Sequence, residues 1–353
     1  MTRILRMEAL FLAALLAGCS STVKSPEPVD PAPTLVSAES VVLSDTPWYF
    51  GDDVGVQLQT NYYRIFTTVR EGVMRRRLPL FLETALHEYM TAFGPLPPPP
   101  AKLYSYVLAT RPQWVQRTKE LMGDKADRFT VIERGGFASR GRGVFWDIGL
   151  QGTFVIAAHE GWHQYLQQTF QHRIPVWLDE GLATYMESFR WDPASPDRPI
   201  FTGWSNVERF DYLRRAEAEG SLVSLQTLLS QTPQELIQQS DELALTYYAQ
   251  VWALIHFLRE GEDGKYNETL HRLLVDASSG QIARVVQLRL DVSSRQAASM
   301  LARGPAVFRL YFNPDLDQAA AEYDAFIEQI VATRSRDKIV AGRSPISGRR
   351  PSP

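Results

Sequence analysis

The stretch AAHEGWHQYLQ, residues 157–167, places two histidines four residues apart and a glutamate directly after the first of them. Apolar residues recur around it at helical spacing, at Val155, Ile156, Ala158, Trp162, Tyr165 and Leu166. This periodicity predicts a helix over 153–170 with Thr153 as its N-cap. The stretch is therefore either an ordinary amphipathic helix or the carrier of a site.

On such a helix His159 and His163 lie one turn apart on the same face, so their imidazoles can converge on one point. Glu160 is rotated by about 100° from His159 and can reach a metal-bound water instead of the metal. This is the HExxH arrangement, in which two neutral imidazoles hold Zn²⁺ and the glutamate takes the proton of the water. The alternative is a solvated helix face that carries these residues by chance.

A catalytic zinc site needs a third protein ligand and one open position. The metzincin continuation, a glycine and a further histidine, is missing after His163. A glutamate on a following helix is the other option, and PVWLDEGLATYMESF (175–189) supplies Glu180, seventeen residues after His163. Thr184 and Glu187 follow on the same helix face and are candidates for orienting a ligating histidine.

These motifs carry a family resemblance. HEGWH followed by WLDEGLATYME resembles the gluzincin metallopeptidases, and the second stretch is similar to aminopeptidase N-type enzymes and to bacterial peptidase-MA-like domains of unassigned function. A third stretch, TYYAQVWALIHFLRE (246–260), resembles the gluzincin helix that begins with a tyrosine acting on the transition state. The resemblance covers roughly residues 54–331 and implies a zincin-like fold.

The resemblance also implies a role for each matching residue. It implies one zinc ion per chain, with three protein ligands: His159, His163 and Glu180. Glu160 would be the general base. Tyr248 would stabilise the developing oxyanion, which raises kcat because that charge exists mainly in the transition state. Tyr247 is the alternative if the register is off by one.

One departure limits what the resemblance implies about substrates. Aminopeptidases of this type carry an acidic anchor for the substrate N-terminus upstream of the zinc helix, and this sequence offers only Asp147 there. An exopeptidase is therefore not inferred. GVFWDIG (143–149) is a candidate edge strand for pairing with an extended peptide.

The N-terminus resembles a bacterial lipoprotein signal. Residues 1–18 have two arginines, an apolar run too short to span a bilayer, and a Leu-Ala-Gly sequence before Cys19. Cys19 is the only cysteine of the chain and would be lipidated, with a flexible tether over 19–50. Ser20 after it resembles the Gram-negative sorting pattern, which implies the outer membrane, facing the periplasm. A plain secretory signal with an incidental cysteine is the alternative.

The remaining chain predicts an α+β fold with a small N-terminal mixed sheet, a mostly helical C-terminal part, and an active site between them. Residues 51–150 are expected to form the α/β part and residues 151–332 the helical, zinc-binding part. The segment 333–353 is basic and rich in Pro, Ser and Gly, so it is expected to be a disordered tail.

The composition is that of a globular protein, and a net charge of −3 excludes nucleic acid as an expected partner. Two functions remain. The first is a lipid-anchored zinc metallopeptidase acting on a peptide or protein of the cell envelope. The second is a catalytically silent envelope lipoprotein that binds or scaffolds. The oligomeric state stays open.

Overall fold

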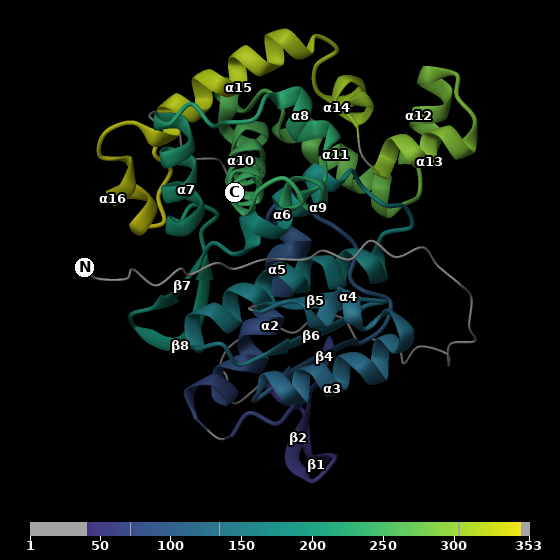
Figure 1. Ribbon diagram of the computed structural model, residues 1–353, viewed down its shortest axis with the longest axis vertical. Helices are drawn as coiled ribbons and strands as arrows, with labels where there is room; N and C mark the ends of the chain where they lie inside the picture. Colours follow the sequence, from purple (N-terminus) through teal and green to yellow (C-terminus); the bar gives the residue numbers. More distant parts are fainter. Residues whose placement is uncertain (1–40, 71, 134, 303, 347–353) are drawn as a thin grey trace. The chain divides into compact units, whose positions relative to one another are not determined.

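The computed structural model describes residues 41–346, apart from residues 71, 134 and 303 (Figure 1). The chain divides into two compact units. The first contains the described residues up to Leu86, Pro99–Gln168 and Asp192–Pro199, and the second contains His87–Pro98, Thr169–Trp191 and the chain from Ile200. A six-stranded sheet in the first unit and a mostly helical second unit confirm the expected α+β class.

The sheet of the first unit has the strand order β1-β2-β3-β4-β6-β5. Its strands are β1 (Ser44–Phe50), β2 (Asp53–Gln59), β3 (Tyr63–Thr67), β4 (Leu103–Leu108), β5 (Gly136–Ser139) and β6 (Arg142–Trp146). The first three strands are antiparallel neighbours, β3, β4 and β6 run parallel, and β5 is antiparallel to β6. Strands β2 and β3 form an antiparallel hairpin.

Helices connect the parallel strands, because a parallel neighbour can only be reached by a crossover. They are α2 (Val73–Thr91) between β3 and β4, and α3 (Arg111–Met122) with the short η1 (Gly123–Lys125) and α4 (Asp127–Thr130) after β4. Helix α5 (Leu150–Thr169) follows β6. Thr110 caps α3 by accepting a hydrogen bond from the Gln113 amide.

The two faces of the sheet are covered differently, since successive side chains of a strand point to opposite faces. On one face, Trp114 of α3 is fully buried, and its indole N–H donates to the carbonyl of Val144 at 3.1 Å. On the other face, Ser105 of β4 donates to Gln164 of α5 at 3.3 Å. Helix α5 is thereby placed against the centre of the sheet.

The expected edge strand at residues 143–149 is wrong. Strand β6 lies between β4 and β5, so its backbone groups pair on both sides. The strand at that edge is β5, and all four of its residues are buried. GVFWDIG is apolar enough for an edge strand or for an interior strand. The sequence does not show the order of the strands in the sheet, so it could not distinguish the two.

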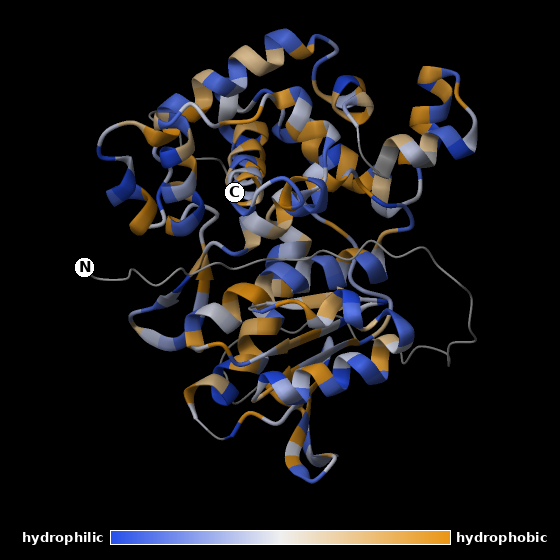
Figure 2. Ribbon diagram, viewed as in Figure 1, coloured by the Kyte–Doolittle hydropathy of each residue, from blue (hydrophilic) through white to orange (hydrophobic). Residues whose placement is uncertain are grey.

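The second unit is built around α10 (Asp241–Glu260). The other helices are α6 (Val176–Met186), α7 (Val207–Ala218), α8 (Leu225–Ser230), α9 (Pro233–Ile237), η2 (Gly261–Gly264), α11 (Asn267–Ser278), α12 (Ile282–Leu290), α13 (Ser294–Ala302), α14 (Ala306–Tyr311), α15 (Leu316–Val331) and α16 (Ser335–Val340). Helix α10 is buried on all sides from Thr246 to Leu258, and Figure 2 colours much of it as hydrophobic. A helix that is apolar around its circumference is a core helix.

Several boundaries in the second half of the chain differ from the prediction. Helix α5 begins at Leu150, so Thr153 is not its N-cap but lies inside its first turn. The helix expected over 175–189 ends at Met186, because the chain turns there into a hairpin of β7 (Phe189–Asp192) and β8 (Ser195–Phe201). Helical spacing alone did not reveal this short hairpin.

The expected disorder after residue 333 is also wrong for the part that the structure describes. Ile339 of α16 is fully buried, and the guanidinium of Arg336 pairs with Asp211 of α7 at 3.1 Å. Farther on, Ser344 donates to the carboxylate of Glu260 at 2.6 Å. Composition did not identify these anchoring contacts.

The predicted signal segment and Cys19 lie outside the described residues. The tether expected over 19–50 is wrong at its end, because Ser44–Phe50 form β1 and pair with β2. Within the described part of the chain, no helix combines the length and the apolar character needed to cross a membrane.

Candidate metal centre

Glutamine side chains fix α5 to the sheet. The amide of Gln164 donates to the carbonyls of Tyr104 and Gly141 at 2.8 and 2.9 Å. One turn farther, Gln167 donates to the carbonyl of Ala138 and accepts from the Gly141 amide. These bonds tie the helix to the backbone of β4, of β5 and of the turn between β5 and β6. They set the position of the helix that carries both histidines.

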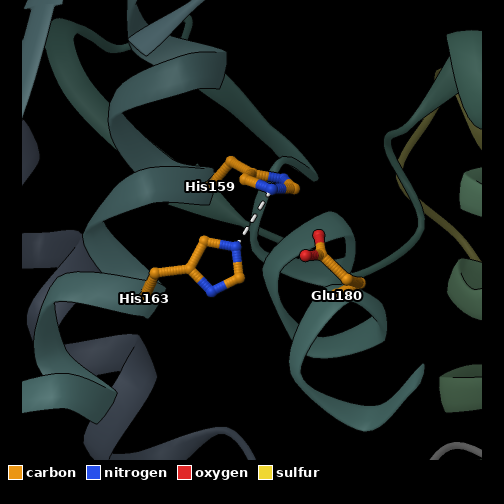
Figure 3. A group of neighbouring side chains, drawn as sticks. All are labelled: His159, His163 and Glu180. Carbon is orange, nitrogen blue, oxygen red and sulfur yellow. Dashed lines mark hydrogen bonds between the residues drawn. The ribbon is translucent and has the colours of Figure 1, made fainter. Parts of the chain in front are cut away.

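The two histidines of α5 converge as the sequence predicts. His159 is fully buried and His163 is 5% exposed. Their Nε2 atoms lie 3.3 Å apart, and Figure 3 shows the two rings turned toward each other. Buried imidazoles of this kind are stable when they are paired or bind a metal.

Glu180 of α6 completes the group. It is 2% exposed, and Figure 3 shows its carboxylate on the side of the two imidazoles. One ligand atom each of His159, His163 and Glu180 lies within 4.8 Å of the others. The structure therefore brings together the three residues that the sequence predicts as ligands, and this buried group can bind a metal ion.

The donor set fits a tetrahedral metal. Two nitrogens at about 2.0–2.1 Å from an ion, separated by a tetrahedral angle, lie about 3.3–3.4 Å apart. The Nε2 atoms of His159 and His163 already have this separation of 3.3 Å. Two imidazoles and a carboxylate are also a ligand set that leaves one position of such an ion open.

Gly181 controls how closely α6 approaches α10. A Cβ at this position would lie 2.8 Å from Cγ1 of Ile255 and 3.0 Å from the carbonyl oxygen of Val251. Real Cβ atoms need more space than this, so the close packing of the two helices requires a glycine. Glu180 is the preceding residue, and its place depends on that packing.

Glu160 and Thr184 lie where the sequence places them. Glu160, beside His159 on α5, is 1% exposed, so a carboxylate is buried next to a candidate metal ligand. The hydroxyl of Thr184 donates to the carbonyls of Glu180 and Gly181 at 2.9 and 2.8 Å. Thr184 therefore stabilises the backbone that carries the ligand. Its expected role in orienting a histidine stays a prediction.

Glu187 makes contacts that the sequence does not reveal. Its carboxylate accepts two hydrogen bonds from the guanidinium of Arg209, at 2.9 and 3.0 Å, and one from the amide of Asn206 at 2.9 Å. Asn206 is the N-cap of α7. Its place directly before the helical segment VERF could have indicated this role, because asparagine is a preferred N-cap residue. Nothing in the sequence marks Arg209 as buried. A histidine-orienting role for Glu187 also stays a prediction.

Both tyrosines at the start of α10 are buried. The ring of Tyr248 lies 5.2 Å from the guanidinium carbon of Arg209. Tyr247 is fully buried, and its hydroxyl has no hydrogen-bond partner among the described residues. Burial and the carboxylate of Glu180 raise the pKa of Tyr247 well above its ordinary value. Both tyrosines thus remain candidates for the predicted oxyanion role.

Asp147, the one acidic residue considered as a substrate anchor, has a local structural contact. Its carboxylate accepts a hydrogen bond from the Gly149 amide at 2.8 Å. This bond shapes the turn that precedes α5, as an aspartate commonly does two residues before the amide it binds.

Part of the chain matches a protein family. A family described as "Protein of unknown function (DUF1570)" matches residues 154–278, which contain the two histidines, Glu180 and both tyrosines. The matched segment is about a third of the chain. No curated protein matches the sequence.

Proposed function

We propose that this protein is a zinc-dependent metallopeptidase that hydrolyses peptide bonds. The observation that carries the proposal is the buried convergence of His159, His163 and Glu180, with the two Nε2 atoms 3.3 Å apart. This separation is what two ligands of a tetrahedral zinc ion require. A carboxylate at Glu160, buried beside the first ligand, supplies the base that a purely structural zinc site does not need.

His159, His163 and Glu180 would hold the zinc ion. When bound, zinc polarises the peptide carbonyl and lowers the pKa of water. Glu160 would take the proton of the attacking water onto its carboxylate and pass it to the leaving amine. Because Glu160 is nearly inaccessible to solvent, it would hold that proton without losing it to bulk water.

Tyr248 would donate a hydrogen bond from its phenol to the oxygen that gains negative charge. Such a bond is stronger in the transition state than in the ground state, so it raises kcat more than it lowers KM. Tyr247 is the alternative donor, since its hydroxyl is buried in the electrostatic field of Glu180.

We place the enzyme in the bacterial cell envelope, anchored by lipid on Cys19 to the outer membrane and facing the periplasm. The lipobox-like sequence before Cys19 supports this proposal. Its substrate would then be a peptide or protein of the envelope.

Two measurements test the proposal: the zinc content of the protein and its hydrolysis of randomised fluorogenic peptides. Both are made on the parent, on Glu160→Gln and on His163→Ala. We expect about one zinc per chain in the parent and in Glu160→Gln, with hydrolysis only in the parent. His163→Ala should lose the metal. A metal-free parent would refute the zinc site. A zinc-loaded parent that cleaves no peptide would favour the silent envelope protein.

Matched substitutions of the two tyrosines identify the oxyanion donor. Tyr248→Phe should lower kcat by about 10²-fold with little change in KM, whereas Tyr247→Phe should leave kcat within about threefold. The reverse pattern would transfer the role to Tyr247. A pure KM effect in both variants would contradict transition-state stabilisation.

A further inference from the structure

Arg209, in the first turn of α7, is a buried cation next to the proposed site. Its side chain is 1% exposed, and that of its partner Glu187 is 2% exposed. Burial opposes the charge of the guanidinium, but the carboxylates of Glu187 and Glu208 outweigh this effect and raise the pKa of Arg209. Arg209 is therefore a permanent charge in the interior of the helical unit.

The ion pair joins the end of α6 to the start of α7. Glu187 is the C-cap of α6, and both of its carboxylate oxygens accept from Arg209. Asn206 reinforces the junction, because its amide donates to Glu187 at 2.9 Å and to the carbonyl of Thr184 at 3.3 Å. The dipole of α7 favours the negative charge of Glu187 near its N-terminus, whereas the dipole of α6 opposes a negative charge at its C-terminus.

The same guanidinium reaches the helix that carries the tyrosines. Its carbon lies 5.2 Å from the ring centroid of Tyr248, within the range of a cation–π contact. Two hydrogen bonds to Glu187 fix the position of the guanidinium, and a cation held against the ring restrains the χ1 rotamer of Tyr248, which sets where its hydroxyl lies. The direction of the phenol hydroxyl thus depends on a residue of α7.

Stability alone is a weak reason for such a pair. Replacing a buried ion pair by apolar side chains of similar volume is often neutral or stabilising, whereas removing one partner is costly. Leu213, one turn after Arg209 on α7, shows that this face of the helix packs with apolar residues. A charged pair at Arg209 and Glu187 is better explained by what it holds in place.

We propose that Arg209 is a positioning residue. Glu187 holds its guanidinium, which fixes the ring of Tyr248 and orients its hydroxyl. The inference rests on the proposed function, because the orientation of this hydroxyl affects activity only if Tyr248 acts on a substrate. Arg209 itself is not proposed to touch the substrate.

The main test replaces the whole pair in the full chain. Arg209→Met with Glu187→Met removes both charges and avoids the unpaired carboxylate that Arg209→Met alone would leave. Arg209→Lys keeps the charge but loses the two-point contact. Asp211→Asn is the matched control, because Asp211 lies on the same helix and pairs with Arg336 on the exposed surface.

Fluorine NMR of the zinc-free protein reads the position of the tyrosine without any activity. With 3-fluorotyrosine at position 248, the parent and Asp211→Asn should each give one narrow resonance. The Met/Met variant should give several resonances or one broadened by exchange, and Arg209→Lys should be intermediate. One narrow resonance in the Met/Met variant would overturn the inference.

Turnover of randomised fluorogenic peptides by the zinc-loaded protein supplies the second readout. The Met/Met variant should lose about tenfold or more in kcat with KM within about twofold, and adding Tyr248→Phe should lower kcat no further than Tyr248→Phe alone. Additive losses would overturn the inference. If the parent cleaves nothing, the proposed function fails, and the fluorine spectra alone decide whether Arg209 positions the ring.

Discussion

Substitution of Gly181 tests whether the approach of α6 to α10 places the ligand Glu180. In Gly181→Ala the new Cβ would lie 2.8 Å from Ile255 Cγ1, whereas carbon atoms in contact are normally about 3.5–4.0 Å apart. The helices must therefore separate by roughly 0.7 Å or more. The second contact, at 3.0 Å, is the backbone oxygen of Val251, which cannot rotate away.

A shift of this size exceeds what a metal site tolerates, since ligand distances are held to about 0.2 Å. We expect zinc affinity to fall by about tenfold or more, as it does when a group supporting a ligand is lost. Overpacking costs about 1–3 kcal/mol, which the better helix propensity of alanine offsets by up to about 1 kcal/mol. The free energy of unfolding of the zinc-free protein should therefore fall by up to about 3 kcal/mol.

Competition with a chromophoric chelator measures the affinity, and urea denaturation measures the stability. Gly152→Ala is the matched control: Gly152 is also inside a helix, but its Cβ would meet only the flexible end of Ile148, at 3.0 Å. That variant should keep both quantities or gain slightly in stability. The reasoning is refuted if Gly181→Ala binds zinc within twofold of the parent and is more stable.

Three further results are expected. Burial raises the pKa of Glu88 from 4.5 to about 7 despite the opposing effect of Arg259, so the folded state retains a proton that the unfolded chain loses between these values. The free energy of unfolding should thus decline by about 1–3 kcal/mol as the pH rises through this window. Urea titrations at pH 5–8 should show no such decline for Glu88→Gln. Equal pH dependence of the parent and of Glu88→Gln would contradict the assignment. Gln164→Met leaves the carbonyls of Tyr104 and Gly141 without their side-chain donor and should cost about 1–3 kcal/mol in urea denaturation; an unchanged midpoint would show that these bonds contribute little. Chelation of zinc should lower the Tm of the parent, because an ion present at about 100 times its Kd contributes about 2.7 kcal/mol; an equal drop in His163→Ala would indicate a different binding site.

The three residues of the candidate metal centre could be predicted from the sequence because short-range rules relate them. His159 and His163 are related by one helical turn, and this relation holds wherever the helix packs. Glu180 was found because chemistry requires a third ligand and the next predicted helix offered one. In each case a short-range rule was sufficient.

Other parts of the molecule depend on contacts far apart in the sequence. The place of β6 inside the sheet is set by its pairing with β4, more than thirty residues earlier, which no local pattern encodes. Arg209 looks like a surface residue until Glu187 is placed beside it. Ile339 looks like part of a disordered tail, because the composition of a segment does not show which of its apolar residues the core buries.

The bond between Ser344 and Glu260 has a consequence for the order in which the protein is made. Glu260 ends the central helix, and its carboxylate accepts hydrogen bonds from the Trp204 indole and from a hydroxyl 84 residues later in the chain. During translation the helical unit therefore acquires α6, which carries Glu180, long before it acquires this contact. A nascent chain paused before residue 344 would expose that end of the unit to proteases and chaperones, and release of the pause would close it.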